Sequence, residues 1–194
     1  MPSGAGDPLA ERTIGGWRGT VAATRFVAQQ GLEWITGNAA IAYGDKLKKY
    51  LRHVVFVKPD VVLLGDVVEP RQPSVFQWML HRQAPFTVDG QQLRLERSRA
   101  GVLVDYIAAE PLTIRQWDGY DPPGSGKAAN VARAFPNQWH VEAAAPRPTE
   151  RALTVTVLRV YRPGRAPYDV VKAVSTRPGF GVIRKNGRTW RLHR

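Results

Sequence analysis

The chain has 194 residues, of which 43% are hydrophobic, and this is enough to bury the core of one domain. It contains no cysteine, which excludes disulfides, thiolate metal sites and a cysteine nucleophile. Its formal net charge of +12 predicts either a basic solvated surface or attraction to a polyanion, such as nucleic acid, an anionic membrane or an acidic polysaccharide.

The first half of the chain is predicted to form short strands separated by turns. Residues 1–16 are Gly, Pro and small polar residues without a period, so we expect a flexible lead-in, and nothing there resembles a signal peptide. Lys58-Pro59-Asp60 is a turn signal between two runs rich in Val and Leu, which are typical of strands covered on both faces. Strands are expected at residues 20–29, 32–36, 47–57, 61–68 and 75–82, with a helical turn or loop at 38–43.

The second half continues the same pattern. Asp89-Gly90 and Asn186-Gly187 each lie between alternating segments, which predicts two β-hairpins. Residues 118–136 are rich in Gly, Pro and Asn and predict a long exposed loop. Strands are expected at residues 86–88, 93–96, 101–108, 112–117, 138–144, 152–161, 168–174, 182–185 and 189–192.

About a dozen short strands without an amphipathic helix favour one class of fold. We predict an all-β protein, an antiparallel and supersandwich-like β-sandwich with little helix, formed by residues 17–194 as a single domain. No internal repeat with a fixed period is present. No apolar run approaches the roughly 18 residues that a membrane span needs, so we expect no membrane partner.

The histidines do not form a local metal motif. No H-x-x-x-H or H-E-x-x-H arrangement occurs. His53, Asp66 and His81 fall on three consecutive predicted strands and would make a three-ligand site if their side chains converged. The favoured alternative is that the histidines are packed or exposed, and that Asp66 follows Gly65 at a bulge. The four histidines are His53, His81, His140 and His193.

Other catalytic motifs are absent or incomplete. The stretch PGSGK at residues 123–127 has Asp121 and Ala128 where a phosphate-binding loop needs Gly and Ser or Thr, so it favours a flexible loop. No G-x-S-x-G elbow of a serine hydrolase occurs. A tyrosine acts as an acid or base only beside a positioned partner. The scattered carboxylates are Asp105, Glu110 and Asp118, and the candidate tyrosines are Tyr43, Tyr106 and Tyr120.

Tryptophans recur in the predicted strands. Tryptophan on a sheet stacks on sugar rings in some proteins, but its default role is packing. We therefore expect core positions for most of them, and an exposed pair in Trp117 and Tyr120, which flank the long loop. The four strand tryptophans are Trp34, Trp78, Trp117 and Trp139.

One ordered set of segments resembles a known family. WITGNAAIAYGDKLKKYLRHVVFVKPDVVLLGDVVE at residues 34–69, followed by FQWMLH at 76–81, resembles the C-terminal half of heparinase II/III-like polysaccharide lyases. The resemblance covers residues 20–160. The features that match the family pattern are residues 37–43, Arg52, Lys58-Pro59-Asp60, Asp66, Trp78 and His81.

The resemblance implies a β-sandwich and places the chemistry elsewhere. The family is similar throughout in having an N-terminal (α/α) toroid and a C-terminal β-sandwich, and its members cleave heparin, heparan sulfate or alginate by β-elimination. The toroid carries the catalytic Asn, His and Tyr. An H-x-H-x-D segment and a later H-N pair supply a further histidine and the zinc site, and neither occurs in this sequence. The family positions matched by Arg52, Asp66 and His81 are interpreted as structural.

The resemblance therefore implies a C-terminal β-sandwich fragment of such a lyase, silent as a catalyst on its own, with no catalytic, cofactor-binding or metal-binding residue. The expected partners are an acidic polysaccharide and the missing toroid. The alternative is a stand-alone binding module for acidic polysaccharide. Nucleic-acid binding rests on charge alone, because no RNP-like strand or recognition helix is present. The resemblance suggests a bacterial protein of the periplasm or the extracellular space.

Overall fold

The computed structural model describes residues 22–119, 138–165, 182–185 and 188–191. The predicted lead-in at residues 1–16, the segment 123–127 and the strand expected at 168–174 lie outside this part of the chain. Within it, no helix is long and apolar enough to cross a membrane. The all-β prediction is confirmed, because thirteen strands and one short 3-10 helix make up the described elements.

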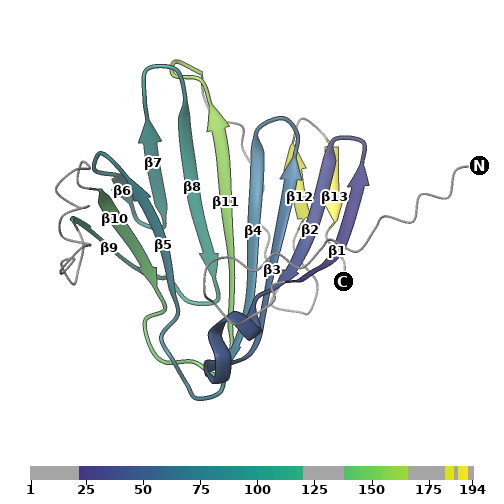
Figure 1. Ribbon diagram of the computed structural model, residues 1–194. Coiled ribbons are helices and arrows are strands. Elements are labelled where there is room, and N and C mark those ends of the chain that lie inside the picture. The colour runs from purple at the N-terminus through teal and green to yellow at the C-terminus, as the bar shows by residue number, and fades with distance from the viewer. Residues whose placement is uncertain (1–21, 120–137, 166–181, 186–187, 192–194) are drawn as a thin grey trace, which may run out of the picture.

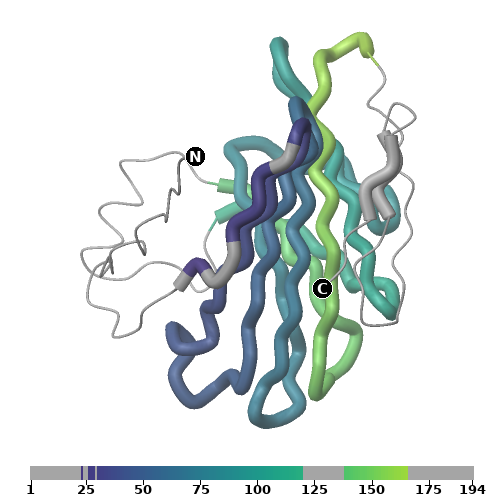
Figure 2. The backbone as a smooth tube through the Cα atoms, turned by 90° about the vertical axis from the view of Figure 1, so that its right-hand side faces the viewer, coloured from purple at the N-terminus to yellow at the C-terminus, as the bar shows by residue number. Residues whose placement is uncertain are grey.

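Eight strands form a large antiparallel sheet in the order β1-β2-β3-β4-β11-β8-β7-β6 (Figure 1). Strand β11 lies between β4 and β8, so it joins two groups of strands that are each consecutive in sequence. Figure 2 shows β1 to β4 and β11 side by side in one layer. The strands are β1 Ala22–Gln29, β2 Leu32–Asn38, β3 Leu47–Val57, β4 Val61–Pro70, β6 Thr87–Asp89, β7 Gln92–Glu96, β8 Gly101–Ala108 and β11 Ala152–Tyr161.

A small antiparallel sheet has the order β5-β10-β9, and β12 pairs with β13 as a separate hairpin. That hairpin is the one predicted around Asn186-Gly187. The 3-10 helix η1, Ala40–Lys46, forms where a helical turn was expected at 38–43, and it lies at the lower end of the large sheet in Figure 1. The strands are β5 Gln77–Arg82, β9 Thr113–Asp118, β10 Trp139–Ala144, β12 Val182–Lys185 and β13 Arg188–Arg191.

The main core lies between the two sheets. Because successive residues of a strand point to opposite faces, one side of β7 and β8 turns its apolar side chains toward β10. Leu93, Val104 and Val141 are fully buried there, and burying one such side chain stabilises the fold by about 1.5–3 kcal/mol. The buried members of this cluster are Phe86, Leu93, Val104, Tyr106, Leu112, Val141 and Ala143.

A second core lies on the opposite face of the large sheet. Val157 of β11 belongs to it, whereas the next residue, Leu158, packs against the core between the sheets. The small sheet covers only part of the large sheet's facing side, since Phe26 in β1 and Ile35 in β2 are 66% and 37% exposed. The buried members of the second cluster are Leu32, Trp34, Val55, Val57, Val61, Leu63, Val155 and Val157.

Strands β3 and β4 form the predicted hairpin around Lys58-Pro59-Asp60. Their register is unbroken from Val57 opposite Val61 to Lys49 opposite Glu69, so Asp66 lies directly opposite Arg52. The expectation of a bulge at Gly65-Asp66 is therefore wrong. No bulge is needed to place a carboxylate in this apolar strand, because the arginine on the neighbouring strand pairs with it.

Strand ends differ from the prediction where isolated contacts replace regular pairing. Strand β5 begins at Gln77 and not at residue 75, because Ser74 is held instead by a single bridge to Thr149. Strands β3, β8 and β11 have the predicted bounds. The side chains of β5 alternate between two faces, since Met79 is exposed while Trp78 and Leu80 are half-buried against the core between the sheets.

Candidate functional site

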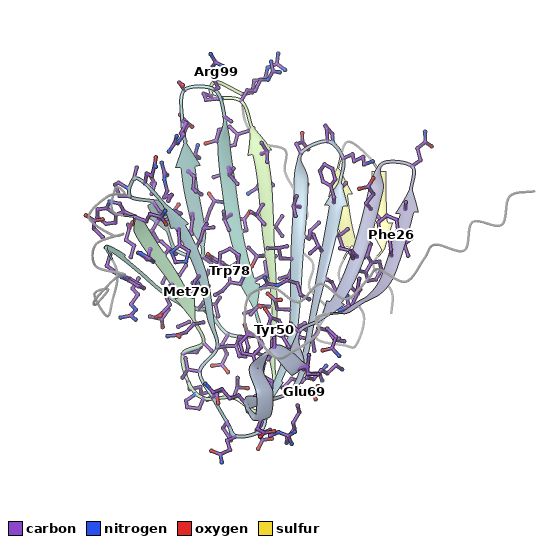
Figure 3. All side chains as sticks on the ribbon, in the orientation of Figure 1. Phe26, Tyr50, Glu69, Trp78, Met79 and Arg99 are labelled. Atoms are coloured by element: carbon purple, nitrogen blue, oxygen red, sulfur yellow. The ribbon has the colours of Figure 1, made fainter. Side chains whose placement is uncertain are left out.

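A cavity of about 180 Å³ lies between the large and the small sheet. Its walls come from β3, β4 and β11 of the large sheet, from β5 and β10 of the small sheet, and from the segments that follow β8 and β10. Figure 3 shows two of its residues, Tyr50 and Trp78, in the region between the sheets. Its charged and aromatic lining side chains are Tyr50, Arg52, Asp66, Phe76, Trp78, Glu110, Arg147 and Arg151.

An ion pair between Arg52 and Asp66 forms the base of the cavity on the large sheet. Two parallel bonds connect the groups: Nε of Arg52 donates to Oδ1 of Asp66 at 2.7 Å, and an Nη donates to Oδ2 at 2.9 Å. The Asp66 side chain is 4% exposed and that of Arg52 is 40% exposed. Such two-bond geometry fixes the guanidinium plane, so Arg52 has a defined orientation at the cavity wall.

Tyr50 lies beside this pair on the same face of β3. The guanidinium carbon of Arg52 is 5.6 Å from the centre of the Tyr50 ring, and Tyr43 of η1 meets that ring edge-on at 5.5 Å. Burial and the nearby Asp66 carboxylate raise the pKa of Tyr50 to about 12. Tyr50 therefore stays a neutral hydrogen-bonding group at physiological pH.

Two further arginines stand at the rim. Arg147 and Arg151 belong to the segment between β10 and β11, and their side chains are 73% and 54% exposed. Arg147 pairs with Glu110, and Nε of Arg151 lies 3.8 Å from a carboxylate oxygen of Glu69. Exposed ion pairs of this kind contribute little to stability, about 0–1 kcal/mol, so both arginines are available to other anions.

The small sheet supplies an aromatic wall. Trp78 meets Tyr106 edge-on, with ring centres 5.2 Å apart and planes at 71°. Burial raises the pKa of Tyr106, and its hydroxyl has no hydrogen-bond partner among the described residues. Tyr106 thus acts as a packing residue that holds Trp78 in place, and not as an acid or base with a positioned partner.

The outer face of the small sheet carries a ladder of polar side chains. Glu142 is buried and accepts hydrogen bonds from Arg115 at 2.8 and 3.2 Å and from Gln77 at 2.7 Å. One step along the strands, His140 stacks on Trp117, with ring centres 5.5 Å apart, and meets His81 edge-on at 4.4 Å. Partial burial, followed by the proximity of His140, lowers the pKa of His81.

The three predicted candidates for a metal site do not meet. His53 lies opposite Gly65, so it points to the other face of β3 from Arg52, and it hydrogen-bonds Thr36. Asp66 is bound by Arg52, and His81 lies on the small sheet beside His140. No group of three or more His, Asp or Glu side chains able to hold a metal occurs in the described residues.

The other candidates are spread over the fold. Trp34 is buried in the core, and Trp78 and Trp139 pack against the core between the sheets, as expected. Trp117 is half-buried, with its Nε1 shielded from solvent, so the expectation that it is exposed is wrong; it is covered by stacking on His140. Tyr120 lies outside the described residues. The carboxylates Asp105, Glu110 and Asp118 lie at different places and form no pair.

Solved structures of heparinases resemble this arrangement of strands. The heparinase III BT4657 gene product matches with a TM-score of 0.65 at 10% sequence identity, over 89% of this chain and 27% of its own. A heparan sulfate lyase, HepC from Pedobacter heparinus, matches with a TM-score of 0.64 at 11% identity, over 90% of this chain and 28% of its own. This chain has the fold of one part of a heparinase.

The resemblance drawn from the sequence is thus confirmed at the level of the heparinase fold. The chain spans little more than a quarter of the length of these lyases, 27% and 28%. No family model matches the sequence, and no curated protein matches it.

Several residues of the cavity were not anticipated. Arg147 and Arg151 lie in the short Pro-rich segment between two predicted strands, and Tyr50 lies near the start of a strand. The signal available in the sequence was Asp66. Asp66 is an acidic residue inside an apolar run, and such a residue needs a partner on a neighbouring strand.

The raised pKa of Tyr50 predicts a loss of stability in alkali. The folded state holds the Tyr50 proton more tightly than the unfolded chain, whose tyrosines titrate near 10.0. The stabilisation is therefore fully present below about pH 10 and is lost as the pH rises through about 12. Between about pH 10 and 12, the free energy of unfolding measured in urea is expected to fall more steeply with pH for the wild type than for Tyr50→Phe. Equal slopes would contradict the prediction.

Proposed function

We propose that this chain is the β-sandwich part of a heparinase II/III-like polysaccharide lyase that cleaves an acidic, uronate-containing polysaccharide by β-elimination. The observation that carries the proposal is the fold, which matches 89–90% of this chain to 27–28% of two lyases with TM-scores of 0.64–0.65. The ordered family features between residues 37 and 81 point in the same direction.

In this proposal the chemistry comes from outside these 194 residues. β-Elimination needs a base for the proton next to the uronate carboxyl, an acid for the leaving oxygen and a group that neutralises the carboxylate. The sequence has no H-x-H-x-D segment. The sandwich supports the catalytic domain and forms part of the wall of its cleft, and its net charge of +12 favours an anionic glycan.

The test compares this chain with the complete product of its gene. Heparin, heparan sulfate and alginate are supplied to each, and the unsaturated product is followed by its ultraviolet absorbance. The 194-residue chain is expected to release none, and the complete product is expected to cleave at least one. Turnover by the 194-residue chain would contradict the proposal that its chemistry lies elsewhere. A complete product inert on all three would overturn the lyase proposal.

The rival function, a stand-alone module that binds acidic polysaccharide, makes a different prediction. A complete gene product of such a module would be retained on a heparin column in a glycan-selective way and would cleave nothing. The arginine-lined cavity is the feature that favours this rival. If the protein is retained equally on every polyanion, and moderate salt abolishes the retention, general basicity would be the explanation instead.

A further inference from the structure

The cavity between the sheets has an excess of positive charge. Three arginines and two carboxylates line it. The pair at the base, Arg52 with Asp66, is neutral as a unit. The excess therefore belongs to the rim, where Arg147 and Arg151 lie in one short segment and only Glu110 among the lining residues opposes them. An anion that enters from solvent meets these two guanidinium groups.

Hydrogen-bond donors remain for such an anion. A guanidinium has five N–H donors, and Asp66 takes two from Arg52, whose side chain is 40% exposed. The pairs of Arg147 and Arg151 are exposed, and the 3.8 Å separation of Arg151 from Glu69 is too long for a hydrogen bond. Arginine is well suited to carboxylate and sulfate groups because its parallel N–H bonds match their oxygens.

The opposite wall suits the flat apolar side of a sugar ring. Phe76, just before β5, and Trp78 of β5 line the cavity, and the contact with Tyr106 holds the indole in a fixed orientation. Tyr50 offers a neutral hydroxyl on the large sheet. A volume of about 180 Å³ is below the roughly 300–1,000 Å³ of drug-sized ligand pockets, so one ring fits and a longer oligosaccharide does not.

We propose that this cavity binds a single anionic sugar residue of an acidic polysaccharide, with its carboxylate or sulfate on Arg147, Arg151 and Arg52 and its ring against Trp78. This site deepens the proposed function and rests on it for the polysaccharide. It places one residue of the glycan within the sandwich itself. The remaining residues of the glycan extend past the exposed rim into solvent.

The experiment measures binding to the 194-residue chain by isothermal titration calorimetry at about 0.15 M salt, where exposed charges are largely screened. The probes are a heparin tetrasaccharide, which carries sulfates and carboxylates, and an alginate tetrasaccharide, which carries carboxylates alone. The double variant Arg147→Gln/Arg151→Gln is expected to bind at least about tenfold more weakly than the wild type, because it loses charge-assisted hydrogen bonds. If the double variant binds the alginate tetrasaccharide more weakly, the carboxylate is the bound group. If only its binding of the heparin tetrasaccharide is weakened, the sulfate is the bound group.

A matched control removes two positive charges far from the cavity. The double variant Arg97→Gln/Arg99→Gln serves, since both side chains are exposed and Arg99 lies at the opposite end of the molecule from Tyr50 (Figure 3). It is expected to bind within about twofold of the wild type. Equal weakening in both double variants, or no binding of either probe by the wild type, would overturn the site. Neither result bears on the lyase proposal, which is decided by product formation from the complete gene product.

Discussion

Asp105→Ala is expected to lower the free energy of unfolding by about 3–5 kcal/mol. The Asp105 side chain is 2% exposed, and its partner Arg159 is 9% exposed. Arg159 donates to Oδ2 of Asp105 at 2.6 Å, and Gln92 donates to Oδ1 at 2.8 Å. Removal of the carboxylate breaks a buried ion pair, and the loss of one partner of such a pair is strongly destabilising because the other charge stays buried.

Urea unfolding followed by circular dichroism measures the effect. The matched control is Glu110→Ala, which removes the carboxylate of an exposed pair with Arg147 and is expected to cost about 0–1 kcal/mol. The double variant Asp105→Leu/Arg159→Leu is expected to regain much of the lost stability, because apolar pairs of similar volume replace buried ion pairs well. Similar losses for Asp105→Ala and Glu110→Ala would show that burial of the pair does not matter.

Gly101→Ala is expected to cost about 1–3 kcal/mol, although it adds only one methyl group. Gly101 begins β8 and lies opposite Tyr161 of β11. A Cβ at this position would lie 2.2 Å from Cζ and 2.6 Å from the hydroxyl oxygen of the Tyr161 ring. That ring cannot shift freely, because its hydroxyl donates to Glu96 at 2.7 Å and accepts from Arg94 at 3.3 Å.

A double-variant cycle isolates this overlap. In a Tyr161→Ala background, Gly101→Ala is expected to cost much less than in the wild type, since the ring that it meets is gone. Ala109→Ser, at an exposed site just after β8, is a control for a small added group without a neighbour to displace. An unchanged cost of Gly101→Ala in both backgrounds would assign the effect to the backbone of the glycine and not to the tyrosine.

Local patterns in the sequence are enough to place many strands. Strands β3 and β4 appear as apolar runs on either side of Lys58-Pro59-Asp60, and β8 and β11 stand out by their Val and Leu content. The faces of β5 follow from alternation alone. These features depend on residues next to one another in the chain, and a single sequence contains that information.

The pairing of distant strands is a different matter. Thr154 of β11 lies between Asp66 of β4 and Ala108 of β8, and no local signal specifies either neighbour. The cavity cannot be predicted from the sequence for the same reason, because Arg147 and Arg151 line it together with Arg52 only when the two sheets take their relative position. Arg52 and Asp66 both match the family pattern in the sequence, but their pairing depends on the register of β3 and β4, which the sequence does not specify.

The central position of β11 has a consequence for the order of folding. Strands β1 to β4 and strands β6 to β8 are each linked by short connections, one of which contains η1, so each group is able to form soon after its residues leave the ribosome. Their union waits for β11, which is made later and must insert between β4 and β8 through contacts of long sequence separation. Until then the chain carries two open sheet edges rich in Val and Leu. The interval before β11 arrives is therefore the period in which a nascent chain is most exposed to aggregation.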